Sequence, residues 1–181
     1  GKGEALWNPD GTIVCSASSA QRGPQIVTDT QGGGIITWID LRNPGLPPQY
    51  DIYSQRISSS GETQWMQNGV AVSRAPKDQY LNITPSVTPD GFGGVIIAWF
   101  DYRSGNSTTA DVYAQRVSAD GTMLWTLTGA PVAANAGQQS HPVVAADGTG
   151  GAYCSWYEDP SSTIMFNVAV QRLDADGVAQ F

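Results

Sequence analysis

Few side chains in this sequence combine a reactive type with a spacing that supports chemistry. His141 is the only histidine of the 181 residues, and it has neither a second imidazole for a zinc site nor a nucleophile-elbow motif. Beside Pro142, at the start of an expected strand, it is a candidate ligand contact. Asp174 and Asp176 precede Gly177 as in the start of a calcium loop, but the third acid and closing Glu are missing. We expect a hairpin turn there, with calcium as the alternative and no other cofactor.

Arginines and acids recur at matched positions, which predicts structural ion pairs rather than catalysis. An active site is needed once, whereas a structural contact is needed in every copy of a repeat. An acid follows each of three tryptophans by two residues, and a Gln-Arg pair lies further along. The predicted pairs are Asp40–Arg56, Asp101–Arg116 and Glu158–Arg172. Arg42 and Arg103 lie in the loops after these acids, where they either bind an acidic group or remain solvated.

A repeat of about 60 residues positions these side chains. A doubled glycine begins six residues before each of the central tryptophans, which are Trp38, Trp99 and Trp156. A proline stands eight residues before that glycine, and an aspartate stands five after the proline. A Gly-x-x-x-aromatic pattern begins at Gly3, Gly61, Gly121 and Gly177, at spacings of 58, 60 and 56 residues. A fixed period of this length indicates a propeller, a solenoid or an array.

Each copy is predicted to be a four-stranded antiparallel meander. Residues 94–100 are β-branched or aromatic, and both faces of that strand are apolar. Such a strand needs cover on both sides, so we expect the copies to pack on one another as β-propeller blades, with a linear solenoid as the alternative. The central tryptophans are expected in the core. Trp7, Trp65 and Trp125 are expected in the core or at a blade edge, with a platform for sugars as the alternative.

The expected organisation is one all-β repeat domain spanning residues 1–181. It comprises a detached outer strand (1–16) and three units (24–73, 85–133 and 142–181), the last of which the outer strand could complete. Propellers have four to eight blades, so three fall short. The remaining blades are expected from a longer parent protein or from a second chain, unless the ring closes unusually.

The composition limits the kinds of partner that the chain can bind. The net charge is −7 with only two lysines, Lys2 and Lys77, which excludes a phosphate-neutralising surface for nucleic acid. No apolar run approaches the roughly 20 residues of a membrane helix, so we expect no membrane insertion. Abundant small polar residues favour a secreted or cell-surface protein. Cys15 and Cys154 fall at different places in the repeat, and they are either two small buried thiols or a disulfide.

The motifs Gly-Gly-x-x-x-x-Trp, Asp-(Ile/Val)-Tyr-x-Gln-Arg and Ser-Ala-Asp-Gly resemble a repeat of large bacterial secreted and cell-surface proteins, which are often adhesin-like. The second unit matches at Trp99, Asp111, Tyr113, Gln115, Arg116, Asp120 and Gly121, and the first at Trp38, Asp51, Tyr53, Gln55, Arg56 and Gly61. The third departs, with Asn167, Ala169 and Pro160 in place of Asp, Tyr and the loop Arg. The turns also partly resemble Asp-box and quinoprotein-type blades.

This resemblance implies propeller blades without assigned chemistry. The expected function is therefore a non-enzymatic extracellular module for adhesion or for binding protein or glycan. One alternative is a propeller-type glycan-active hydrolase or lyase, whose active residues would lie in loops that do not repeat. The other alternative is a structural spacer in a surface protein.

Overall fold

The computed structural model describes residues 7–43, 50–75, 86–104, 109–160 and 166–181. Every regular element in these ranges is a β-strand, and the strands form three antiparallel sheets. The all-β prediction is thereby confirmed. Within the same ranges, no helix has the length and apolar character needed to cross a membrane.

Each sheet is a meander in chain order. The first sheet consists of β1 (Gln21–Thr28), β2 (Gly34–Asp40), β3 (Asp51–Ile57) and β4 (Val70–Ser73). The second consists of β5 (Ser86–Pro89), β6 (Val95–Asp101), β7 (Asp111–Val117) and β8 (Ala130–Ala133). The third has three strands within the described residues: β9 (Gln138–Ala146), β10 (Ala152–Asp159) and β11 (Asn167–Leu173).

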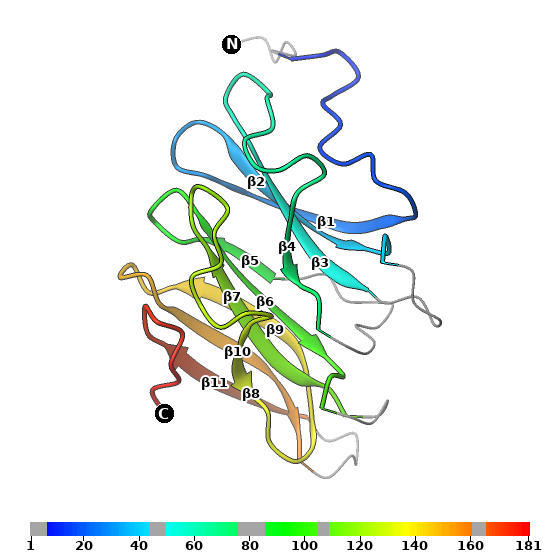
Figure 1. Cartoon of the computed structure of the whole chain (residues 1–181). Coiled ribbons are helices and arrows are strands. Elements are labelled where there is room, and N and C mark those ends of the chain that lie inside the picture. Colours follow the sequence, from blue (N-terminus) through cyan, green and yellow to red (C-terminus); the bar gives the residue numbers. More distant parts are fainter. Residues whose placement is uncertain (1–6, 44–49, 76–85, 105–108, 161–165) are drawn as a thin grey trace.

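The sheets lie against one another in sequence order, with the second between the other two (Figure 1). The first strands are neighbours, because β5 contacts both β1 and β9. This is the blade arrangement of a propeller, left open. The segment of residues 7–16 and strand β11 lie at opposite sides of the stack (Figure 1).

The core consists of two layers, one on each face of the second sheet. All seven residues of β6 are buried, as the two apolar faces of its sequence predict. Val95, Ile97 and Trp99 pack in the cluster shared with the first sheet, and Ile96, Ala98 and Phe100 in the cluster shared with the third sheet. Trp38, Trp99 and Trp156 are all buried.

In the first and third sheets, the recurring proline lies at a β-bulge opposite the central tryptophan. In the pairing of β1 with β2, the register shifts between Arg22 and Gln25, so that Pro24 faces Trp38 without a ladder partner. The pairing of β9 with β10 shifts in the same way around Pro142. Proline has no N–H to donate, so a bulge is one of the few strand positions that accepts it.

Residues 7–16 lie against the first sheet. The indole Nε1 of Trp7 donates to the Ser59 carbonyl at 2.9 Å, and the Ser16 N–H donates to Asn68 Oδ1 at 2.8 Å. In a single chain this segment therefore does not pair with β11, which lies at the other side of the stack (Figure 1).

Candidate ligand-binding end of the sheets

Ion pairs at one end of the sheets, where the first strand turns into the second, are the same in all three copies. We call this the turn end. Asp90 is 1% exposed; its Oδ1 accepts from the N–H groups of Phe92 and Gly94 at 2.8 Å each, and its Oδ2 accepts from Arg116 Nε at 3.0 Å. The equivalent pairs are Asp29–Arg56 and Asp147–Arg172. The turn carboxylate thus holds both its own turn and the third strand.

The predicted ion pairs are therefore wrong. Arg56, Arg116 and Arg172 bind the aspartates of the turns, and not Asp40, Asp101 and Glu158. Antiparallel pairing explains the error, because it places Arg56 opposite Ile35, five residues along β2 from Asp40. At about 3.4 Å per residue the two side chains are some 17 Å apart along the strand.

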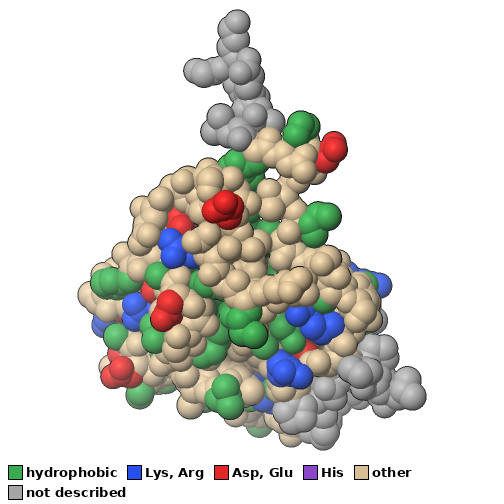
Figure 2. Space-filling model, turned by 45° about the horizontal axis from the view of Figure 1, so that its top comes forward, with side chains coloured by type: hydrophobic (Ala, Val, Ile, Leu, Met, Phe, Trp, Pro, Cys, Tyr) green, Lys and Arg blue, Asp and Glu red, His purple; other side chains and the backbone are tan. Residues whose placement is uncertain are grey.

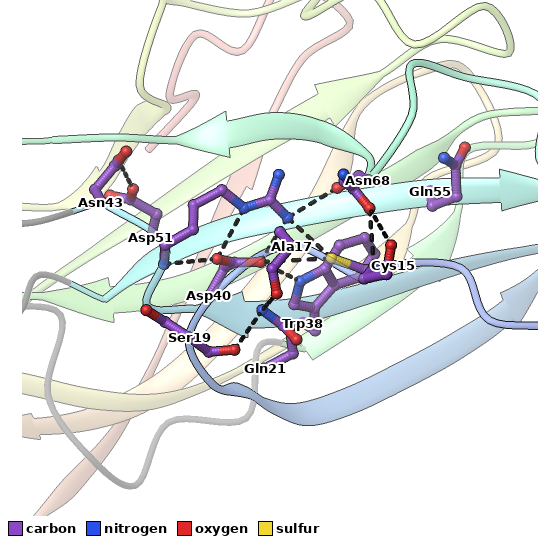
Figure 3. A network of polar contacts seen from close by, with 12 residues as sticks. Cys15, Ala17, Ser19, Gln21, Trp38, Asp40, Asn43, Asp51, Gln55 and Asn68 are labelled. Carbon is purple, nitrogen blue, oxygen red and sulfur yellow. Dashed lines mark hydrogen bonds and ion pairs between the residues drawn. The ribbon is translucent and has the colours of Figure 1, made fainter.

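The acids that follow the tryptophans lie at the opposite end, which we call the loop end. Asp40 is fully buried and accepts from Trp38 Nε1 at 2.8 Å and from Arg42 Nη2 at 2.6 Å (Figure 3). Burial opposes ionisation of Asp40, but these bonds outweigh it, so its pKa is lowered. In the second sheet, Asp101 binds Trp99 and Arg103 in the same way.

Arg42 and Arg103, the candidate ligand-binding arginines, are committed to these internal contacts. The Arg42 guanidinium carbon lies 3.8 Å from the centre of the Tyr53 ring, and the Arg103 guanidinium lies 3.6 Å from that of Tyr113. Their side chains are 17% and 14% exposed. Each arginine is therefore a structural cation between a carboxylate and an aromatic ring.

The third sheet lacks this arrangement. Glu158 accepts from Trp156 Nε1 at 2.8 Å, but its second contact is Gln139 Nε2 at 2.9 Å, because Pro160 occupies the place of the arginine. The loop end is thus built differently in the third sheet, whereas its turn end retains the shared Asp147–Arg172 pair.

Two buried aspartates at the loop end carry unusual pKa values. Burial raises the pKa of Asp51 to about 6, against partial compensation from Arg74 and a hydrogen bond from Asn43 (Figure 3). Burial also raises the pKa of its equivalent, Asp111. Raised carboxyl pKa values occur in general acids. Both groups are at most 3% exposed and stand at a repeated position, so we assign them to the fold.

The second set of tryptophans joins neighbouring sheets. Trp65 Nε1 donates to the Ala119 carbonyl at 3.0 Å, and Trp125 Nε1 donates to the Ala175 carbonyl at 2.9 Å. Each ring lies on a glycine of the next unit's turn, Gly121 or Gly177. Trp7 makes the same contact with the first sheet, but it is 40% exposed.

The remaining candidates have ordinary surroundings. Asp174 Oδ1 accepts from the N–H groups of Asp176 and Val178, which is the bonding of a hairpin turn. Nowhere in the described ranges do three His, Cys, Asp or Glu side chains group as metal ligands. Cys15 and Cys154 are both free. Cys154 is buried, and burial raises its pKa to about 12, whereas Cys15 is half-buried.

A row of aromatic side chains crosses the loop end between the second and third sheets. Its members, in spatial order, are Tyr102, Phe100, His141, Tyr157 and Phe166, with successive ring centres 6.3, 5.7, 5.6 and 5.9 Å apart. We call this set the aromatic row. His141 is exposed, Tyr157 is 47% exposed and Phe166 is 52% exposed. Of these residues, the sequence identifies only His141 as a site candidate.

The backbone at His141 adopts a left-handed conformation, with φ of +53°. The equivalent bulge residue of the first sheet is Gly23, with φ of +58°, which glycine adopts without strain. The chain thus accepts backbone strain at 141 and places an imidazole between Phe100 and Tyr157. Strain of this kind in a non-glycine residue is a reason to look for function.

Comparisons with known proteins find similarity among solved structures alone. No protein-family model matches the chain, and no curated protein matches it. Among solved structures, it is similar to the crystal structure of an endo-arabinase from Bacteroides thetaiotaomicron VPI-5482, with 15% sequence identity and a TM-score of 0.46. The match covers 83% of this chain and 55% of that one, so the chain spans about half the length of that protein.

Proposed function

We propose that this chain is a non-enzymatic β-propeller module that works outside the cell and binds a carbohydrate at the aromatic row. The observation that carries the proposal is a row of rings in which half-buried Tyr102 and exposed His141 have no aromatic equivalent in the other copies. Adjacent rings offer flat apolar surface to the C–H faces of a sugar, and the polar tips of Tyr102 and His141 can hydrogen-bond its hydroxyls. Exposed apolar groups rimmed by polar ones commonly mark binding sites.

Charge distribution supports binding rather than catalysis. The acids of the turns are paired with arginines, and the acids that follow the central tryptophans are paired with arginine or indole groups. Figure 2 shows one face on which charged side chains of both signs lie among polar surface, with hydrophobic groups between them. The glycan-active enzyme is therefore the second candidate, supported only by the raised pKa of Asp51 and Asp111.

A glycan array probed with the whole chain tests the proposal, followed by titration of the best ligand. Tyr102→Ala and His141→Gly should each weaken binding about tenfold or more, which corresponds to about 1.4 kcal/mol. His141→Gly is the sharper variant, because glycine already stands at the equivalent bulge and relieves the left-handed strain. Its free energy of unfolding should stay within about 1 kcal/mol of the parent.

The matched control is Phe92→Ala, an exposed aromatic beside the opposite end of β6. It should leave affinity unchanged. Absence of any glycan binding would refute the carbohydrate assignment and favour a spacer or a protein-binding module. Binding that neither loop-end variant weakens would place the site elsewhere. Cleavage of a bound glycan that Asp51→Asn abolishes would establish the enzyme instead.

A further inference from the structure

The third sheet presents an uncovered apolar face. Its members are Val143, Tyr153, Tyr157, Val168 and Val170, with exposures of 65, 44, 47, 76 and 58%. We call this set the open face. Strand register places these residues on one side of the sheet, since Tyr157 pairs with Val168, and Ser155 pairs with Val170 and with Val143.

The repeat shows what covers such a face. The equivalent pairs of the second sheet are Phe100 with Val112 and Ala98 with Ala114, and all four residues are at most 8% exposed because the third sheet packs on them. A further sheet of the same design is therefore the surface that fits the open face.

The other end of the same chain carries the complementary surface. Ile36 and Trp38 of the first sheet correspond to Ile97 and Trp99, which pack against the preceding sheet. Ile36 is only half-buried, and an apolar hollow of roughly 190 Å³ lies beside it, lined in part by Ile13 and Trp38. The equivalent Ile97 is completely buried.

Residues 7–15 already occupy the place of an outer strand that belongs to a preceding sheet. Trp7 lies on the Ser59–Gly61 turn as Trp65 lies on the Ala119–Gly121 turn. Eight residues after these tryptophans, Cys15 Sγ accepts from Arg42 Nη2, as Ser73 Oγ accepts from Arg103 Nη2. Ser73 lies in β4, so Cys15 corresponds to the fourth strand that the described third sheet lacks.

We propose that two copies of this chain join head to tail into one six-sheet ring. Residues 12–15 of each copy pair with β11 of the other, and the open face of each third sheet packs on the first sheet of its partner. The contact continues the interface already repeated twice within one chain. Two copies give six sheets, within the four to eight of a closed propeller, whereas three copies would give nine. Heterologous contacts that close in this way form a finite ring.

The register defines one cross-link that only this arrangement permits. Cys15, Ser73 and Ala133 are equivalent positions of the repeat, and so are Val168, Ile52 and Val112. Because Ser73 pairs with Ile52 and Ala133 pairs with Val112, Cys15 of one copy should pair with Val168 of the other. Directly opposed residues of antiparallel strands have Cα atoms about 4.5–5.5 Å apart, within disulfide range. Within one chain, the segment of residues 7–16, which contains Cys15, and strand β11, which contains Val168, lie at opposite sides of the stack (Figure 1).

The test starts with the solution mass of the unmodified chain, by light scattering over a range of concentrations. A mass twice 19.2 kDa is expected at high concentration, and a monomer throughout would overturn the proposal. Val170→Glu should give a folded monomer, because Val170 is exposed in the single chain. Leu127→Glu is the matched control, since Leu127 is 82% exposed and does not belong to the open face, and this variant should remain dimeric.

Oxidised Val168→Cys should then run as a covalent dimer on a non-reducing gel, and the band should vanish in Val168→Cys with Cys15→Ser. Cross-linking that survives loss of Cys15 would indicate open faces packed on each other and would overturn the arrangement. A ladder of higher oligomers would overturn the two-copy ring. None of these readouts depends on glycan binding, so the assembly and the proposed function can fail separately.

Discussion

Replacement of Gly177 by alanine tests the contact that joins the second and third sheets. Gly177 has φ of +79°, and a Cβ there would lie 2.6 Å from Cγ of Trp125 and 2.8 Å from its Cδ2. Trp125 is 6% exposed and bonded through Nε1 to Ala175, so it cannot move without losing packing. We expect Gly177→Ala to lower the free energy of unfolding by about 1–2 kcal/mol because of the left-handed backbone and by about 1–3 kcal/mol more because of overpacking. The total loss should be about 2–5 kcal/mol.

Gly148→Ala is the matched control within the same sheet. Gly148 has φ of +80°, but no heavy atom lies within 4 Å of a Cβ placed there. Gly148→Ala should therefore lower the free energy of unfolding only by the backbone cost of about 1–2 kcal/mol. Urea unfolding followed by far-ultraviolet circular dichroism measures both. In a Trp125→Ala background, Gly177→Ala should cost no more than Gly148→Ala. Equal losses for the two glycine variants in the parent chain would refute the proposed role of the tryptophan contact.

Three further predictions concern charge. Arg116→Ala should cost about 2–4 kcal/mol in urea unfolding, because it strands the buried Asp90 carboxylate; a loss below about 1 kcal/mol would contradict burial of the pair. The raised pKa of Asp51, about 6 when folded, means that the folded state holds an extra proton between about pH 4 and 6. Protonation of Asp51 therefore makes the protein more stable as the pH falls through that window. Asp51→Asn should remove this dependence and stabilise the fold at pH 7 by up to about 3 kcal/mol. A difference in free energy of unfolding between variant and parent that stays constant from pH 4 to 7 would contradict this prediction. Calcium added after EDTA treatment should shift the melting temperature by less than about 1 °C if Asp174 serves only its turn, and a larger rise abolished by Asp174→Asn would establish a calcium site.

Much of the fold could be predicted because the repeat forces equivalent residues into equivalent places. The double-sided burial of β6 follows from the alternation of its own side chains, and the open three-sheet arrangement from three copies of one pattern. The predicted ion pairs are wrong because sequence spacing alone does not contain the strand register. Once β2 and β3 are paired antiparallel, Arg56 must lie near the Asp29 turn rather than near Asp40.

The aromatic row could not be predicted in the same way. Its rings come from two different sheets, so their proximity depends on packing between sheets. One signal was available in the sequence. Aligning the copies on their bulge prolines places His141 where the first unit has Gly23, and a histidine at a position suited to glycine is conspicuous.

The differences between copies concentrate at the loop end, and this favours function there. At the turn end the third copy keeps its Asp147–Arg172 pair and the contact of Gly177 with Trp125. At the loop end it replaces the arginine by Pro160, and Asn167 stands where the other copies have a buried aspartate. A contact needed only for packing has the same use in every sheet, whereas a ligand site is needed once. The third sheet differs from the other two at the loop end, which is also where its histidine and exposed rings lie. Because the arginine and aspartate contacts of the other sheets are missing there, this end of the third sheet can carry a site of its own.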